Sequence, residues 1–319
     1  MGKKLCVIGG GYWGKNHIKT LYEMGSLGGI VETEKDRLNE HLSKYAVQGF
    51  LDLEDAIKEN FDGYIVATPA ITHYPIGKIL LSRGLNVLLE KPMTLSTEHA
   101  QELVEIAKES NARLMVGHVL LFHPAIKKIK EIVDSGKLGK LYYAYSNRLN
   151  FGKVRTEENV FWSFAPHDIS VLNYLIGSSA LKIKAKGSKY LQDNVYDVTM
   201  AQFTYPNNVH AHIFVSWLHP FKEQRLIVVG EKGMLSFEDS SKDKSLIYYD
   251  KHVDFVEHQP ILLSEPDEVI SYEKKLPLTE ELKYFIENLD SNIEIADGQS
   301  GLEVVKVLET VQELIDNEN

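Results

Sequence analysis

The feature that most constrains the fold is a glycine pattern close to the start of the chain. Gly9, Gly11 and Gly14 are spaced as Gly-x-Gly-x-x-Gly, directly after the apolar run Leu5–Ile8 and before a helical spacing of apolar residues that stops at Gly25. In a strand–turn–helix of this kind, the first glycine permits a tight turn, the second lets the backbone approach a pyrophosphate, and the third lets helix and strand close up. The helix N-terminus then offers free N–H groups to phosphates. We therefore predict a dinucleotide site at this turn.

An acidic residue completes the expected cofactor pattern. Glu32 ends the second predicted strand, where a carboxylate binds the hydroxyls of the adenosine ribose and repels the 2′-phosphate of NADP, so we expect NAD rather than NADP. The alternative is that Glu32 is a solvated strand end and that Arg37 approaches a phosphate. Further cofactor contacts are expected in the glycine turn and at the ends of the strands predicted near residues 64–69 and 86–90, at Tyr12, Trp13, Thr68, Pro69, Glu90 and Lys91.

The first part of the chain alternates strand and helix signals. Strands are expected near residues 5–8, 27–33, 64–69, 86–90 and 113–117, with helices between them. Asp52 and Ser96 are predicted helix N-caps. Such alternation implies right-handed crossovers and a parallel sheet, so residues 1–118 are predicted to form an NAD-binding Rossmann domain with a doubly wound sheet.

The alternation of strand and helix patterns ends after about residue 118. Long runs with β-branched and aromatic residues predict strands at 140–150, 181–191, 195–205, 209–217, 225–229, 234–237 and 246–249. Pro206–Asn208 is a predicted hairpin turn, Pro166–Ile176 a helix that interrupts the strands, and the end of the chain is again helical. Residues 119–319 are thus expected to form a substrate-binding and oligomerisation domain, an α+β unit with a large, open, mostly antiparallel sheet. The overall class is α/β.

Composition narrows the function classes. A formal charge of -10 without a dense basic stripe argues against nucleic acid as a partner. Cys6, the single cysteine, lies in an apolar run, which excludes an internal disulfide and fits a reducing compartment. No apolar run approaches the ~18 residues of a membrane helix, and the first residues do not read as a signal segment, so we expect a cytoplasmic protein without membrane contact. His210 and His212 share one face of a predicted strand, but no set with metal-ligand spacing accompanies them, and no metal is expected.

Two further motifs carry a family resemblance. Ala67–Pro69 ends the strand predicted near residues 64–69, and Glu90–Pro92 ends the strand predicted near residues 86–90. Together with the glycine turn, the chain resembles the Gfo/Idh/MocA family of glucose–fructose oxidoreductases, inositol dehydrogenases and related sugar dehydrogenases. The resemblance spans almost the whole chain and continues through Val116–His118, Lys137–Lys140 and His167-Asp168.

The resemblance implies that Lys91 and His167 are the catalytic pair of an NAD-dependent oxidoreductase acting on CH–OH groups. The residue types suit that chemistry, because a histidine titrates near neutrality and can accept a hydroxyl proton. An ammonium group can stabilise the developing alkoxide while the hydride passes to the nicotinamide. For this chemistry the two side chains are expected to converge beside the reactive end of the cofactor.

The chain departs from the family at two positions. Ser163 and Ser170 stand where many members carry acids, four residues before and three after the histidine, which makes myo-inositol dehydrogenase a less expected function. Ser163 can still bind a sugar hydroxyl. Asp168 is a candidate to assist or to bind substrate, and the alternative is a charge at a helix N-terminus.

Further residues are expected to bind the substrate. Arg148 and Arg155 suit a carboxylate or diphosphate, unless they pair with Glu157 and Glu158. His118 is the best placed of the remaining histidines. The resemblance is closest to the branch that acts on nucleotide-linked amino sugars, such as UDP-N-acetylglucosamine-type 3-dehydrogenases, which implies 3-dehydrogenation of a UDP-amino sugar.

Several alternatives stay open at this point. The chain can be an inositol or free-sugar dehydrogenase, a reductase of an unrelated ring, or a non-catalytic NAD-binding regulator. The sheet strands carry apolar residues such as Phe203, Phe214 and Val228, so helices are expected to cover one face. A second subunit is expected on the other, giving a homodimer or homotetramer.

Overall fold

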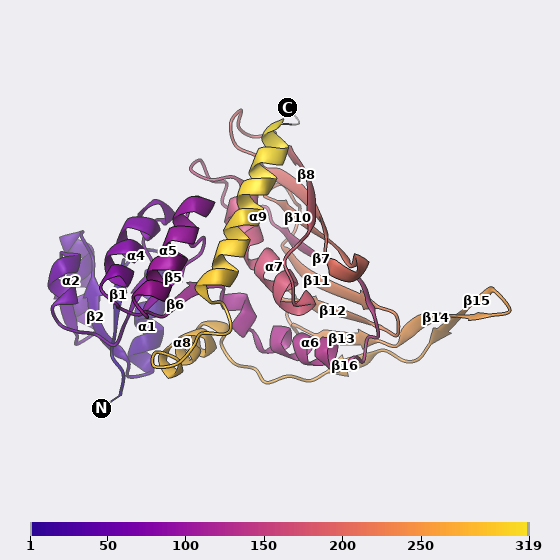
Figure 1. Cartoon of the computed structure of the whole chain (residues 1–319), viewed down its shortest axis with the longest axis horizontal. Helices are drawn as coiled ribbons and strands as arrows, with labels where there is room; N and C mark the ends of the chain where they lie inside the picture. The colour runs from indigo at the N-terminus through magenta and orange to yellow at the C-terminus, as the bar shows by residue number, and fades with distance from the viewer. Residues whose placement is uncertain (1, 318–319) are drawn as a thin grey trace. The chain divides into compact units, whose positions relative to one another are not determined.

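The computed structural model describes residues 2–317, which form two compact units. The first unit runs through Phe122 and also contains Lys275–Lys306. The second contains His123–Lys274 and the end of the chain from Val307. Figure 1 shows the elements of each unit. The domain boundary expected between residues 118 and 119 stays a prediction.

A parallel sheet forms the centre of the first unit. Within the described residues it has six strands in the order β3-β2-β1-β4-β5-β6. Their bounds are β1 (Leu5–Ile8), β2 (Leu27–Val31), β3 (Gln48–Phe50), β4 (Gly63–Val66), β5 (Val87–Glu90) and β6 (Leu114–Gly117). The order reverses between β1 and β4, and such switch points are where open α/β sheets bind ligands, beyond the carboxyl ends of the strands.

Helices connect these strands, and further helical segments of the unit follow β6. They are α1 (Gly14–Glu23), α2 (Lys35–Lys44), α3 (Leu53–Ile57), η1 (Ala70–Thr72), α4 (His73–Ser82), α5 (Thr97–Glu109), η2 (Val119–Phe122) and α8 (Pro277–Glu287). Asp52 caps α3 by accepting from the Glu54 N–H, and Ser96 caps α5 by accepting from the His99 N–H. Both caps were predicted from the sequence and are confirmed. The segment before α9 joins this unit because the Val116 N–H donates to the Ala296 carbonyl (2.7 Å).

The second unit is built on a mixed sheet. Among the described residues it has eight strands in the order β16-β13-β12-β11-β7-β10-β9-β8, and only the pair β7–β10 is parallel. The strands are β7 (Leu141–Leu149), β8 (Lys182–Ser188), β9 (Val198–Thr204), β10 (His210–Ser216), β11 (Glu223–Gly230), β12 (Met234–Glu238), β13 (Leu246–Tyr249) and β16 (Glu268–Ile270). The other elements are α6 (Pro124–Asp134), α7 (Val160–Ile176), η3 (Pro206–Asn208), α9 (Gly298–Asn317), which begins in the first unit, and the hairpin β14 (Lys251–Val256)–β15 (Gln259–Ser264). The predicted α/β class, with a Rossmann half and a largely antiparallel half, is confirmed.

The two faces of the mixed sheet differ. Phe203 and Val228 are buried (3% and 1% exposed) on the face against which α7 packs. Phe214 and its strand neighbour Met200 lie on the opposite face, where Met200 is 44% exposed. Of the three apolar residues named from the sequence, Phe203 and Val228 therefore lie on one face of the sheet and Phe214 lies on the other.

Helix α7 starts earlier than predicted. The sequence suggested a first turn at Pro166, but the Asn159 side chain caps the helix by accepting from the N–H groups of Phe161 (2.9 Å) and Trp162 (3.1 Å). Pro166 lies inside the helix. Proline is common in first turns, and this preference led to the wrong start. As a consequence Asp168 is not a charge at the helix N-terminus, and that alternative is wrong.

No helix of the described residues is long and apolar enough to cross a membrane.

Candidate functional site

The glycine turn between β1 and α1 requires glycine for steric reasons. Gly9 has a φ of +94°, and a Cβ there would lie 2.9 Å from the Ala67 carbonyl oxygen. A Cβ on Gly14 would lie 1.8 Å from the Gly9 carbonyl oxygen, so only glycine lets α1 begin this close to β1. A Cβ on Gly11, in contrast, would meet nothing within 4 Å. The backbone at Gly11 thus faces open space, which a ligand can approach closely.

Glu32 lies just beyond β2 and is 5% exposed. Its carboxylate accepts from the N–H of Gly10 (2.9 Å) and of Glu34 (3.0 Å), and from Arg37 (3.2 Å). Burial alone would raise the pKa of Glu32, but these two N–H groups and the Arg37 charge lower it below the ordinary value. Glu32 is therefore a carboxylate attached to the glycine turn. Arg37 also pairs with Glu34, so two acids hold its charge.

The turn also contacts the end of β5. Tyr12, in the turn, is 85% exposed. The indole N–H of its neighbour Trp13 instead donates to Glu90 Oε1. The His17 Nε2 of α1 lies 2.6 Å from the same oxygen, and the Lys91 N–H donates to Glu90 Oε2 (3.1 Å). Burial opposes ionisation of Glu90, but His17, Trp13 and Lys91 together lower its pKa below the ordinary value. The Glu90 carboxylate thus connects the glycine turn to the backbone of Lys91.

A buried histidine connects the loops after β4 and β5. His73 Nε2 lies 2.9 Å from the Thr68 carbonyl oxygen, and its Nδ1 lies 2.8 Å from the Pro92 carbonyl oxygen. Thr72 donates its hydroxyl to Thr68 Oγ1 (2.7 Å), and Pro69 precedes η1. Burial lowers the pKa of His73. Both ring nitrogens therefore face main-chain oxygens, and His73 holds together two loops predicted to contact the cofactor.

His118 follows β6, the strand beside β5. It is 1% exposed, and neither ring nitrogen has a hydrogen-bond partner within residues 2–317. Burial lowers the pKa of His118 to about 4, against a partial opposing effect of the Glu90 charge. The ring is thus neutral at pH 7. It stays a predicted substrate ligand.

In the second unit, α7 carries Ser163, His167 and Ser170. Ser163 and His167 are four residues apart and so share one face of the helix. The Ser170 hydroxyl donates to the His167 carbonyl oxygen (2.8 Å). Ser163 and Ser170 are buried.

The predicted ligands Arg148 and Asp168 pair with each other. The Asp168 carboxylate accepts from Arg148 Nε (2.8 Å) and Nη2 (3.0 Å), and from the Ser146 hydroxyl (2.6 Å). Burial opposes the charge of Arg148, but Asp168 raises its pKa above the ordinary value. Arg148 is therefore paired within the sheet–helix core, with a partner other than the two acids expected from the sequence.

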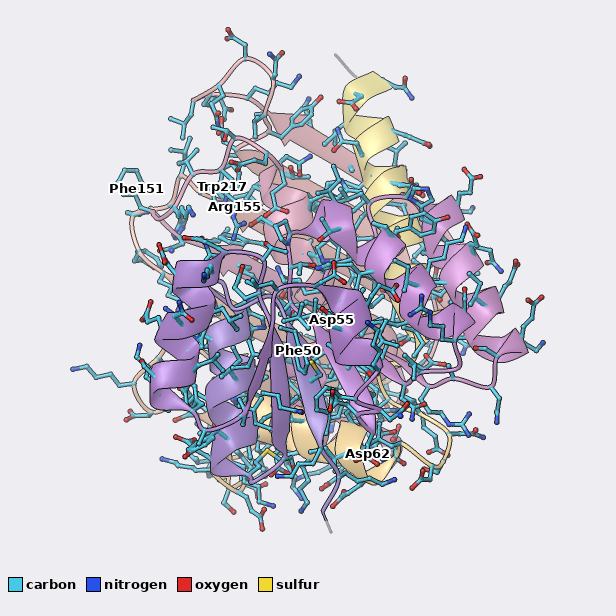
Figure 2. The ribbon with its side chains drawn as sticks, turned by 90° about the vertical axis from the view of Figure 1, so that its left-hand side faces the viewer. Phe50, Asp55, Asp62, Phe151, Arg155 and Trp217 are labelled. Atoms are coloured by element: carbon cyan, nitrogen blue, oxygen red, sulfur yellow. The ribbon has the colours of Figure 1, made fainter. Side chains whose placement is uncertain are left out.

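The loop between β7 and α7 carries the remaining predicted ligand. Arg155 pairs with Glu158 (2.8 Å), which is one of the pairings considered as an alternative. Phe151, which is 76% exposed, projects from the same loop (Figure 2). Of the predicted residues, the structure thus brings Trp13, Glu90 and the Lys91 backbone together in the first unit, and Arg148 and Asp168 together in the second.

Sequence reasoning missed three histidine or acid positions in the first unit. They are His17, His41 and Glu281. His41 Nε2 lies 2.8 Å from the Gly10 carbonyl oxygen and supports the turn from α2. A lone polar residue on an apolar helix face is the signal that marks each of them, but that signal has no fixed spacing.

Two family models match most of the chain. Residues 3–118 match the model described as an oxidoreductase family with an NAD-binding Rossmann fold, and residues 126–236 match the GFO/IDH/MocA C-terminal domain.

Individual relatives are distant but extend over the chain. The UDP-N-acetylglucosamine 3-dehydrogenase of Acidithiobacillus ferrooxidans is 25% identical over 303 residues, which is 94% of this chain and 93% of the relative. A crystal form of that enzyme superposes with a TM-score of 0.88 at 24% identity, covering 99% of this chain and 98% of the other. An inositol 2-dehydrogenase of Corynebacterium glutamicum is 27% identical over 58% of each chain. The WlbA dehydrogenase of Bordetella pertussis, solved with NADH and UDP-GlcNAcA, shares the fold (TM-score 0.81, 18% identity, 100% of this chain and 98% of the other).

Proposed function

Because the chain belongs to the Gfo/Idh/MocA oxidoreductase family, we propose that it is an NAD-dependent dehydrogenase that oxidises a secondary alcohol of a sugar or nucleotide-sugar. The observation that carries this proposal is the connection Trp13–Glu90–Lys91, which fixes a lysine beside the dinucleotide turn. A lysine fixed there can hydrogen-bond a substrate oxygen next to the nicotinamide. The nicotinamide, when the cofactor is bound, supplies the acceptor for the hydride.

The first unit fits a dinucleotide. The open space at Gly11 leaves room for a pyrophosphate, and the N-terminus of α1 adds the positive end of the helix dipole. We assign NAD rather than NADP because the ionised Glu32 would repel a 2′-phosphate. Arg37, the cation that would bind that phosphate, is paired with Glu32 and Glu34.

Lys91 and His167 are the proposed catalytic residues. In our proposal His167 accepts the proton of the substrate hydroxyl, and the Lys91 ammonium hydrogen-bonds the same oxygen and stabilises the developing negative charge. Ser163, on the same helix face as His167, binds a neighbouring hydroxyl. The reverse direction uses the same groups, with His167 returning the proton.

For the substrate we propose a UDP-linked amino sugar oxidised at its 3-hydroxyl. The similarity to a UDP-N-acetylglucosamine 3-dehydrogenase over almost the full chain supports this class. His118 and Arg155 remain proposed substrate ligands. Arg148 and Asp168 can bind substrate only after their mutual ion pair rearranges. The similarity to an inositol 2-dehydrogenase favours a free polyol as the second candidate.

We also propose a homodimer or homotetramer that uses the open face of the mixed sheet. This face carries Met200 and Phe214 beside each other, and Tyr145 stacks on His212 next to them. Exposed apolar patches of this kind on soluble proteins mark contact surfaces.

A thermal-shift screen with NAD present, followed by NADH absorbance assays, tests the function. UDP-sugars should stabilise the protein and yield NADH, whereas free sugars and inositols should do neither. Stabilisation by inositol alone would overturn the substrate class. Stabilisation by NAD without turnover of any candidate would favour a regulator.

A further inference from the structure

An acidic side chain of the first unit is buried without a partner. Glu281 lies on α8, is 0% exposed, and neither of its oxygens has a hydrogen-bond partner within residues 2–317. The next residue, Leu282, and Phe285 are also fully buried, so this face of α8 is apolar. An ionised carboxylate in such a place lacks both water and a compensating cation, which strongly disfavours its charge.

The charged groups around Glu281 come from three other segments. Helix α8 packs against α1, which carries His17, and against η2, which directly follows His118. Glu90, beside Lys91 at the end of β5, interacts electrostatically with Glu281. His17 is engaged with Glu90, and His118 is neutral at pH 7, so neither histidine compensates a charge on Glu281. Burial and the Glu90 charge both raise the pKa of Glu281 well above its ordinary value.

The two buried acids therefore have opposite surroundings. Glu90 accepts from Trp13 and from the Lys91 N–H and lies against His17, which favours its carboxylate form. Glu281 has none of these contacts. Pairs of acids in environments that separate their protonation states are a recurring arrangement near reactive groups.

We propose that Glu281 is a neutral carboxylic acid in the folded protein, so that of these two buried acids Glu90 alone is negatively charged. By staying neutral, Glu281 acts as a positioning residue for the Glu90–Lys91 segment. A second negative charge would repel Glu90 and disturb the hydrogen bond that fixes the Lys91 backbone. The charge state of Glu281 stands on the structure alone, whereas its effect on turnover rests on the proposed function of Lys91.

Infrared spectroscopy of the full chain without substrate tests the charge state. The difference spectrum between wild type and Glu281→Gln at neutral pH should contain the C=O stretch of a protonated carboxylic acid. Glu287→Gln is the matched control, because Glu287 is an exposed acid of the same helix, and its difference spectrum should contain carboxylate bands and the amide bands of the substituted side chain, without the C=O stretch of a protonated acid. Carboxylate bands from Glu281 would overturn the proposal.

Urea unfolding against pH gives a second test that needs no activity. The unfolded chain releases the Glu281 proton near its ordinary pKa of 4.5, whereas the folded chain retains it. Wild-type stability relative to Glu281→Gln should therefore fall as pH rises above that value, by up to about tenfold in the unfolding constant per pH unit, until the raised pKa is passed. A constant difference between the two variants over that range would contradict the proposal.

The positioning role has its own readout. NADH-linked turnover of wild type should decline as Glu281 ionises at high pH, and Glu281→Gln should lack this decline while Glu287→Gln retains it. The same decline in all three proteins would refute the positioning role. Because the first two experiments use no substrate, a failure of the dehydrogenase proposal leaves their result intact and the two failures can be told apart.

Discussion

The buried ion pair of the second unit gives a prediction whose size can be worked out from its contacts. The Asp168 carboxylate accepts three hydrogen bonds, two from Arg148 and one from Ser146, and the side chains of Asp168 and Arg148 are only 3% and 12% exposed. Replacing Asp168 by asparagine keeps the shape but leaves the guanidinium buried without a counter-charge. Breaking one partner of a buried pair costs about 3–5 kcal/mol. We expect Asp168→Asn and Arg148→Met each to lose that much unfolding free energy.

A double-mutant cycle measured by urea unfolding separates pairing from packing. The double variant Asp168→Asn/Arg148→Met should lose less stability than the sum of the two single changes, because no uncompensated charge remains. The control is Arg155→Met, which removes the exposed Arg155–Glu158 pair and should change stability by no more than about 1 kcal/mol. Additive single effects, or single losses below about 1 kcal/mol, would refute the reasoning.

Two further predictions concern the first unit. Gly11→Ala should keep the melting temperature of the protein without ligand, because a Cβ there meets nothing within 4 Å, but it should lose the stabilisation by NAD. Gly14→Ala should lower the melting temperature of the protein without ligand, since its Cβ would lie 1.8 Å from the Gly9 carbonyl oxygen. Equal effects of the two changes in a thermal-shift assay would contradict this reading of the turn. His118 should make the wild type less stable in acid: its folded pKa of about 4 lies below the ordinary 6.5, so stability falls as pH drops from 6.5 to 4, by up to about 3 kcal/mol. His118→Gln should flatten that part of the stability curve, and an unchanged slope in urea unfolding would show that the ring is not held neutral.

The features that the sequence predicted well are local ones. Strand β1 and the start of α1 follow from an apolar run, three glycines and a helical spacing, all within one short segment. The caps Asp52 and Ser96 were likewise predictable, because a cap depends on its own side chain and on N–H groups two or three residues ahead. The Rossmann order then follows from the alternation of elements.

The misses depend on contacts between distant segments or on weak local signals. Arg148 and Asp168 pair through the packing of α7 on the sheet, which no spacing encodes. The hairpin β14–β15 turns at Glu257 and His258, both with positive φ, and so lacks the glycine or asparagine that marks such turns. Helix α8 was missed together with its buried Glu281, whose surroundings are assembled from three other parts of the first unit.

The central claim is that Lys91 and His167 act on the same substrate hydroxyl. Single-turnover kinetics of NADH formation with the best UDP-sugar test it through Lys91→Met, His167→Asn and the double variant. Exposed residues of the same types, Lys108→Met and His258→Asn, are the controls. We predict that each single change lowers the rate about 10²- to 10⁴-fold and that the double variant loses less than the product of the two effects. Rates within about twofold of wild type in either single variant would contradict the account, since a lost general acid or base typically costs far more.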